Sequence, residues 1–201
     1  MNKEHIYRVA RTADRTDADL LEDFTFPWLD RDPPATKFRA WHDEENLYFE
    51  FSAEDTDIVL HSDGDDDTKV LGSDRVELFF ASSPDLLKPY YGFEMDPRGL
   101  TYDYEGTYHR QFTTSWTLPG FATEAEILPT GYQVSGSFSL ADLRALGCLR
   151  EKEMITGVYR GEFSHLPDGS VQQDWISWVD PETETPDFHV PESFGLFVLE
   201  N

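Results

Sequence analysis

The chain has 201 residues, with 40 Asp and Glu against 16 Lys and Arg, and a formal net charge of −24. So acidic a surface repels phosphate backbones and anionic lipids, so neither nucleic acid nor a membrane is an expected partner. Aromatic residues make up 14% of the chain. A disordered acidic segment would hold far fewer, so the composition indicates a folded domain.

The first segment, MNKEHIYRVARTADRTD, has no apolar run of the kind found in a secretory signal. No stretch approaches the roughly 20 apolar residues that a bilayer-spanning helix needs. As written, the sequence predicts a cytoplasmic protein. A chain from which a signal had been removed would read the same way and would be secreted or periplasmic. Cys148 is the single cysteine, so no internal disulfide is expected.

Most predicted elements are strands, because apolar and polar residues alternate with period two between turn-forming segments. In chain order they are TKFRAW (36–41), NLYFEFSA (46–53), DRVELFFA (74–81), YYGFEMD (90–96), GYQVSGSFS (131–139), MITGVYRGEF (154–163), VQQDWISWV (171–179) and FGLFVLE (194–200). The alternation predicts which side chains are buried between two sheets. These are Phe49, Phe51, Val76, Leu78, Phe80, Val134 and Phe138.

One short helix is predicted after Ser139, which can cap it, and Gly147 can end it. A second helical turn is expected at ADLLEDF (18–24), whereas the acidic run HSDGDDDTK (61–69) is expected to be a loop. With one or two short helices among many strands, the sequence predicts an all-β, antiparallel β-sandwich of the jelly-roll or Greek-key type. We expect residues 1–201 to form a single domain.

Two tryptophans, Trp175 and Trp178, lie three residues apart near the end of the chain. They have opposite parity, so in a regular strand they face opposite sides of the sheet and at most one enters the core. The other could present a flat apolar surface to a sugar ring, with nearby acids and amides for the hydroxyl groups. Parity with Ile176 places Trp178 inward and Trp175 outward. Simple packing of both rings is the alternative.

Several polar residues admit both a structural and a functional interpretation. Glu77 is either a solvated charge or an acceptor for sugar hydroxyls, and Arg160 forms either a salt bridge or a forked donor to a ligand. Asp55, Asp57 and Asp74 lie in acid-rich segments that could supply oxygen ligands to calcium. The alternative is a solvated acidic loop.

Three segments, ENLYFEF, DRVELFF and FHVPESFG, together resemble the family-nine carbohydrate-binding-module-like proteins, which occur appended to xylanases and also alone. The resemblance extends over nearly the whole chain. It implies a β-sandwich that binds sugars and lacks catalysis. It also implies that a structural calcium ion is bound, with Asp55, Asp57 and Asp74 as candidate ligands.

The resemblance further implies a clamp, in which two tryptophans hold the end of a sugar chain between them. An acid and an arginine assist this clamp by contacting sugar hydroxyls. Trp178 is similar to one clamp tryptophan, Glu77 to the acid and Arg160 to the arginine. The second clamp tryptophan is expected shortly before DRVELFF, where this sequence has Val70 and Leu71 instead. The aromatic residues that could replace it are Tyr90, Tyr91 and Trp116.

The sequence therefore predicts a non-catalytic protein that binds a neutral oligosaccharide or monosaccharide in glycan utilisation, with a carbohydrate as its partner. No oligomeric state is predicted. Two alternatives remain open. One is a glycoside-active enzyme that uses a pair of carboxylates in the same cleft. The other is a haem-binding sandwich domain, in which Met95 and histidines would ligate iron.

Overall fold

The computed structural model describes residues 5–201, which form mainly β-strands. The strands are β1 (Ile6–Arg11), β2 (Thr36–His42), β3 (Asn46–Glu54), β4 (Arg75–Ala81), β5 (Tyr90–Met95), β6 (Thr101–Thr107), β7 (Gln111–Thr113), β8 (Ala122–Leu128), β9 (Gly131–Ser139), β10 (Leu149–Arg150), β11 (Glu153–His165), β12 (Val171–Ser177) and β13 (Gly195–Leu199). The helices are α1 (Asp66–Leu71) and α2 (Leu140–Ala145), with short 3-10 turns η1 (Arg15–Asp17) and η2 (Pro191–Ser193).

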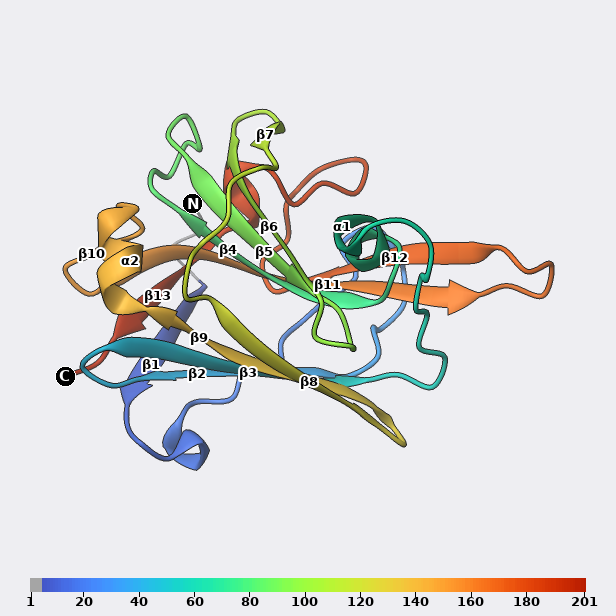
Figure 1. Cartoon of the computed structure of the whole chain (residues 1–201), viewed down its shortest axis with the longest axis horizontal. Coiled ribbons are helices and arrows are strands. Elements are labelled where there is room, and N and C mark those ends of the chain that lie inside the picture. Colours follow the sequence, from blue (N-terminus) through green and yellow to red (C-terminus); the bar gives the residue numbers. More distant parts are fainter. Residues whose placement is uncertain (1–4) are drawn as a thin grey trace.

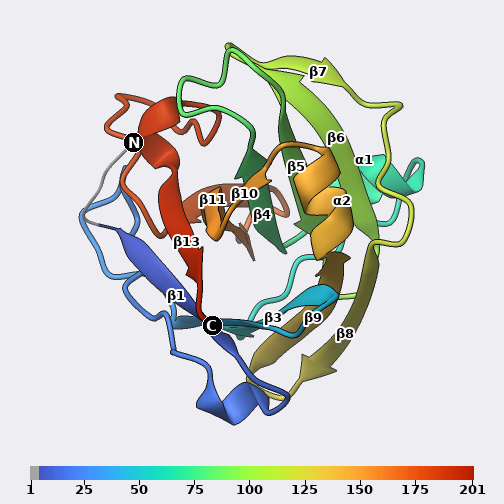
Figure 2. The same cartoon turned by 90° about the vertical axis from the view of Figure 1, so that its left-hand side faces the viewer.

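Two sheets face each other and share one strand. Their combined order is β7-β6-β5-β4-β11-β13-β1-β2-β3-β9-β8, and β10 and β12 also pair with β11. We call β2, β3, β9 and β8 the lower sheet, and β4 to β7 with β10 to β13 the upper sheet (Figure 1). Strand β1 joins them, because its first four residues pair with β13 and its last two pair with β2 (Figure 2).

The predicted sandwich architecture is confirmed, but the prediction of a purely antiparallel arrangement is wrong. Strand β1 runs parallel to both β13 and β2. Parallel neighbours cannot be joined by a tight hairpin. Here the partner strands come from distant parts of the chain, which local sequence patterns do not reveal.

The inner faces of the two sheets form the main hydrophobic core. All seven residues predicted to be buried have exposed fractions of 1% or less: Phe49, Phe51, Val76, Leu78, Phe80, Val134 and Phe138. Within each strand these residues lie two or four positions apart, so they share the face that points into the sandwich. Helix α2 lies at one end of this core (Figure 2) and adds the buried Leu140 and Leu143.

The helix predictions have mixed outcomes. Helix α2 forms where expected, and the Ser139 hydroxyl accepts a hydrogen bond from the backbone N–H of Asp142 at 3.3 Å. The expected turn at 18–24 is wrong, since Leu21 instead forms an isolated bridge with Phe38 of β2. The acidic run is not wholly a loop, because Asp65 caps helix α1 and Val70 anchors that helix in the interior.

The outer face of the upper sheet is also largely covered. Strand β4 is buried at every position, so its Phe79 packs on the side opposite the main core. The loop between β12 and β13 folds back over this face and contributes Phe188 and Phe194 to a second hydrophobic cluster. Because the cover is incomplete, the same face also contains a pocket.

Candidate functional site

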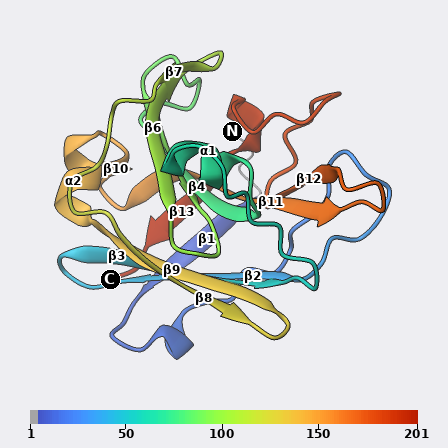
Figure 3. The ribbon, with the colours of Figure 1, turned by 45° about the vertical axis from the view of Figure 1, so that its right-hand side comes forward.

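A pocket of about 300 Å³ opens on the outer face of the upper sheet. Its floor is formed by residues of β4, β5 and β6, and the other lining residues come from the end of α1, from β7 and the turn before it, from β12 and from the loop before β13. Figure 3 shows the ribbon of these elements. The lining residues are Leu71, Arg75, Glu77, Glu94, Tyr102, Tyr104, Arg110, Phe112, Trp175, Pro186, Asp187, Phe188 and His189.

Strand alternation determines which polar side chains reach the pocket floor. In β4, Val76 and Leu78 face the core, so Arg75 and Glu77 face outward into the pocket. Glu77 lies directly opposite Glu94 of β5 in the register of the two strands. The pairing therefore places two carboxylates side by side on one face.

A buried ionic cluster joins these residues. The Nε of Arg75 donates to Glu77 Oε1 at 2.9 Å and to Glu94 Oε2 at 2.6 Å. Burial and the adjacent Glu94 carboxylate raise the pKa of Glu77 to about 8, although Arg75 acts in the opposite direction. One guanidinium can balance only one of the two carboxylates, so Glu77 holds a proton to higher pH than a solvated glutamate does. The pocket floor can then both donate and accept hydrogen bonds.

Trp175 forms the aromatic side of the pocket. The guanidinium carbon of Arg75 lies 5.0 Å from the centroid of its ring, and Phe163 and Phe188 contact it edge-on at 5.7 and 5.8 Å. These contacts hold the ring in one orientation, and the side chain remains half-buried. The pocket therefore has a fixed flat apolar surface.

The loop before β13 is fixed over the pocket by polar contacts. Asp187 accepts hydrogen bonds from Arg110 Nη1 and from the backbone N–H of His189, both at 2.9 Å, and pairs with His109 at 2.7 Å. Tyr90 Oη and His189 Nδ1 are 2.9 Å apart. Burial lowers the pKa of His189 to about 3, so its ring is neutral. Of these residues, only Tyr90 was considered as a sugar contact from sequence; the two histidines were named only as possible ligands in the haem alternative.

Trp178 lies in the core and not in the pocket. Its exposed fraction is 3%, and its ring contacts those of His5 and Phe197, both at 5.8 Å between centroids. A Cβ on Gly195 would approach it within 2.6 Å, so the ring fills its site closely. The expectation of an exposed Trp178 is therefore contradicted. The structure instead places Trp175 in the pocket, as the parity argument proposed.

Arg160 faces the opposite side of the sheet from Glu77. In the register of β11 and β4, Glu77 pairs with Tyr159 while Arg160 pairs with Val76, so the two side chains diverge. Arg160 is fully buried and donates to the Glu54 carbonyl oxygen at 2.8 Å and to the Thr36 hydroxyl at 3.1 Å. It cannot contact the same ligand as Glu77.

The other aromatic candidates also lie outside the pocket. Tyr91 faces the main core and packs against Trp116, with ring centroids 4.7 Å apart and planes 40° apart. Neither residue lines the pocket. Leu71 does line it, in the segment where the resemblance implies a second clamp tryptophan. Met95, a ligand in the haem alternative, is fully buried in the core.

The acidic candidates separate into two places. Asp55 and Asp74 meet Glu162, with one carboxylate oxygen of each within 4.8 Å of the others. Asp57 lies apart and accepts hydrogen bonds from the backbone N–H and the ring of His165, at 2.7 and 2.8 Å. The structure thus places Asp57 outside the cluster and Glu162, which was not predicted, within it.

We expect the stability of the protein to fall as pH rises. Burial raises the pKa of Asp74 from 3.8 to about 8 and that of Glu162 from 4.5 to about 7. Between the unfolded and folded values the native state binds more protons, so stability is greatest at the acidic end of this window and declines as pH rises through 7 and 8. Thermal melts at pH 5 and 8 should differ by several degrees, since about 1 kcal/mol shifts Tm by about 2–4 °C at this size.

The Glu162→Gln variant is the control for this effect, because it removes one titrating group and should flatten the profile. A melting temperature that rises between pH 5 and pH 8 in the unmodified protein would contradict the expectation.

Among residues 5–201, no helix has the length and hydrophobicity needed to span a bilayer.

The sequence and the fold of this chain are similar to those of known proteins. Residues 16–201 match the family described as carbohydrate family 9 binding domain-like. A proposed carbohydrate-binding protein from Bacteroides uniformis is 17% identical, with a TM-score of 0.72 over 97% of each chain. No curated protein matches the chain.

A carbohydrate binding module of family 9 from Caldicellulosiruptor kristjanssonii is also similar, at 16% identity. Its complex with glucose has a TM-score of 0.62 over 98% of this chain and 96% of that one. Its complex with cellotriose has a TM-score of 0.60 over 98% and 94%. At these identities the structural similarity shows a common fold.

Proposed function

We propose, from the premise that this chain belongs to the carbohydrate family 9 binding domain-like family, that its pocket binds a neutral monosaccharide or oligosaccharide without catalysis. The proposal rests on one observation: Trp175 and the Arg75–Glu77–Glu94 cluster line the same pocket. An apolar ring surface beside a few fixed polar groups is the usual composition of a small-ligand site.

The ring of Trp175 would stack against the apolar face of a sugar. Burying this surface contributes about 25 cal/mol for each Å² of apolar area removed from water. Phe112 and Tyr102 add further aromatic lining. Arg75 and Phe188 already hold the tryptophan ring in place. Its side chain therefore loses little conformational entropy when a sugar binds.

Several polar atoms in the pocket are available to hydroxyl groups. Within residues 5–201, no hydrogen bond uses Arg75 Nη2, Glu77 Oε2 or Glu94 Oε1. Each hydrogen bond to a sugar hydroxyl contributes about 1 kcal/mol net, because water is displaced from both partners. The acidic surface favours a neutral sugar over a uronic acid.

Calorimetric titration with glucose and cellotriose tests this function, with glucuronic acid as the charged control. We expect dissociation constants nearer millimolar than micromolar, on the order of −4 to −6 kcal/mol, for the neutral sugars. Binding of neither would overturn the proposal. A parallel assay for sugar release from xylan and cellulose oligomers should detect none, and sustained release would favour the glycoside-active alternative.

Leu71 offers a way to strengthen binding. It lines the pocket, and its side chain is exposed at the end of α1, so a larger ring can be accommodated. Leu71→Trp would give the sugar a second aromatic surface, worth about 0.5–1.5 kcal/mol. We expect affinity for cellotriose to rise roughly 2- to 12-fold by calorimetry. Leu71→Ala is the matched control and should not tighten binding; unchanged affinity in the tryptophan variant would place the ligand away from α1.

We also propose a structural calcium ion at the Asp55–Asp74–Glu162 cluster. Arg160 pairs with Glu162 and lies 3.8 Å from Asp55, so it supplies one positive charge to three carboxylates. A divalent ion would balance the other two charges. The buried Oδ2 of Asp55 has no hydrogen-bond partner within residues 5–201, and oxygen atoms of this kind suit calcium.

Calcium should therefore stabilise the protein more at pH 8 than at pH 5, because protons compete with the ion for the same oxygens. An ion present at about 100 times its dissociation constant would add about 2.7 kcal/mol of stability. Melts with calcium and with a chelator measure this effect, and Asp55→Asn should reduce it while Asp57→Asn should not. Equal melting temperatures with calcium and chelator at pH 8 would rule out the ion.

A further inference from the structure

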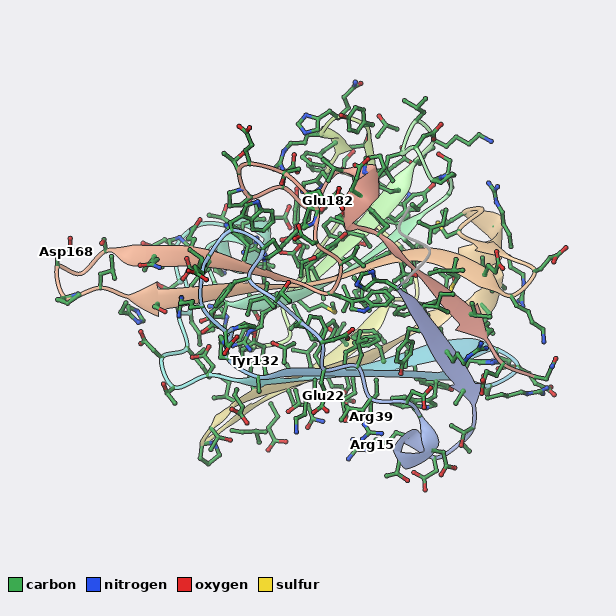
Figure 4. The ribbon with its side chains drawn as sticks, turned by 180° about the vertical axis from the view of Figure 1, so that it is seen from behind. Arg15, Glu22, Arg39, Tyr132, Asp168 and Glu182 are labelled. Atoms are coloured by element: carbon green, nitrogen blue, oxygen red, sulfur yellow. The ribbon has the colours of Figure 1, made fainter. Side chains whose placement is uncertain are left out.

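A second hollow lies on the outer face of the lower sheet, on the other sheet from the pocket. Two adjoining hollows of about 370 and 360 Å³ share the residues Arg15, Glu50, Glu124 and Ser135 and so form one groove. Figure 4 shows Arg15 and Arg39 on the side of this sheet that is turned away from the upper sheet. The groove shares no lining residue with the Trp175 pocket.

A pair of aromatic rings forms one end of the groove. Trp41 of β2 and Tyr48 of β3 are direct cross-strand partners, and their rings stack with centroids 5.7 Å apart and planes 15° apart. The Tyr48 hydroxyl donates to Asp43 Oδ2 at 2.9 Å and accepts from Asn46 Nδ2 at 3.3 Å. Tyr48 is thus held in place from the β2–β3 turn, while both rings remain half-buried.

Small and polar side chains form the floor beside these rings. Ser137 of β9 pairs with Tyr48 on one side and with Ala122 of β8 on the other. Because both side chains are small, the sheet surface next to the aromatic rings is low. The next residues of β9 that line the groove are Ser135 and Gln133. From Ser137 to Gln133 the floor extends about 13 Å, at about 3.3 Å per residue. A groove of this length suits an extended chain better than a single ring.

The charges around the groove indicate what kind of chain it would take. The acids Glu50, Glu124 and Glu126 line it, and Arg15 is paired with Glu50. This rim disfavours polyanions such as nucleic acids and uronate polymers. Hydroxyl groups on the floor and carboxylates on the rim can instead bond a polyhydroxylated chain. We propose that this groove is a second binding site, for the interior of an uncharged polysaccharide chain.

The proposal goes beyond the function of the pocket and is separable from it. Trp41 and Tyr48 would also stabilise the sheet simply as a cross-strand aromatic pair, and that role requires no ligand. Binding must therefore be measured in a protein whose pocket is disabled. Trp175→Ala provides that background, since it removes the aromatic surface of the pocket and lies on the other sheet.

Native electrophoresis in gels containing hydroxyethylcellulose or arabinoxylan measures the site, with carboxymethylcellulose as the anionic control. Each substitution replaces one uncharged residue by another, so the mobility of the protein in a gel without polymer should not change. We expect Trp175→Ala to remain retarded by at least one neutral polymer, and Trp41→Ala/Tyr48→Ala in that background to lose at least 10-fold in affinity. Tyr48→Phe keeps the ring and should retain the retardation. Melting curves confirm that each variant is folded.

The outcomes separate this site from the pocket. If Trp175→Ala is no longer retarded, or if the unmodified protein is retarded by neither neutral polymer, the second site is overturned. The pocket function would stand if glucose or cellotriose still binds the unmodified protein. Conversely, if a neutral polymer retards Trp175→Ala and the unmodified protein binds neither glucose nor cellotriose, the groove is supported and the pocket function is overturned. Equal retardation with and without the Trp41 and Tyr48 rings would also overturn the groove.

Discussion

Trp178→Ala is expected to lower the free energy of unfolding by about 3–5 kcal/mol, the usual cost of removing a large buried aromatic side chain. The ring is nearly inaccessible and packs between His5, Phe197 and the backbone at Gly195. Its removal leaves a cavity that these neighbours cannot close without moving strands. The sugar affinity of the remaining folded protein should not change, since Trp178 does not line the pocket.

Denaturant titration of Trp178→Ala measures this loss, with Trp175→Ala, three residues earlier in the chain, as the matched control. Trp175 is half-buried, so its removal should cost clearly less stability. A Trp178→Ala variant with unchanged stability and abolished sugar binding would contradict the structure and restore Trp178 as the ligand contact.

The contrast between the two tryptophans shows what sequence patterns can predict here. Alternation depends only on the pleat of a strand, so parity with Ile176 correctly placed Trp178 inward. The resemblance to a family assigned the ligand contact to Trp178, which the structure buries. Within one strand, the local rule was more reliable because it needed no alignment with another protein.

Relationships between strands were beyond these patterns. Glu77 and Arg160 were expected to share a ligand, but the register of β4 and β11 sends them to opposite faces. Register is set by long-range pairing, and a shift of one residue exchanges the faces. Sequence patterns also did not reveal the parallel pairing of β1 or the loop with Asp187 and His189 that covers the pocket. Both depend on contacts between distant segments of the chain.

The pocket floor illustrates a second limit. Glu77 was identified from sequence as a candidate sugar contact, whereas its partners Arg75 and Glu94 were not. Strand β4 is buried on both faces, so its polar residues lie in an interior site and not on a solvated surface. Only the structure shows that two carboxylates share one guanidinium there.

The central claim is that a neutral sugar binds against Trp175 in the pocket of the upper sheet. Calorimetric titration of Trp175→Ala with cellotriose tests it most directly. Removal of the ring eliminates the stacking surface, and loss of a central aromatic contact costs 2 kcal/mol or more in typical interfaces, or about 30-fold in affinity. From a millimolar starting affinity, that loss takes binding beyond detection.

The variant must be compared with Trp178→Ala under conditions where both proteins are folded, as shown by their melting curves. We predict that cellotriose binds Trp178→Ala as it binds the unmodified protein, and that Trp175→Ala shows no measurable binding. Cellotriose affinity that survives in folded Trp175→Ala at its original value would contradict the assignment of this pocket.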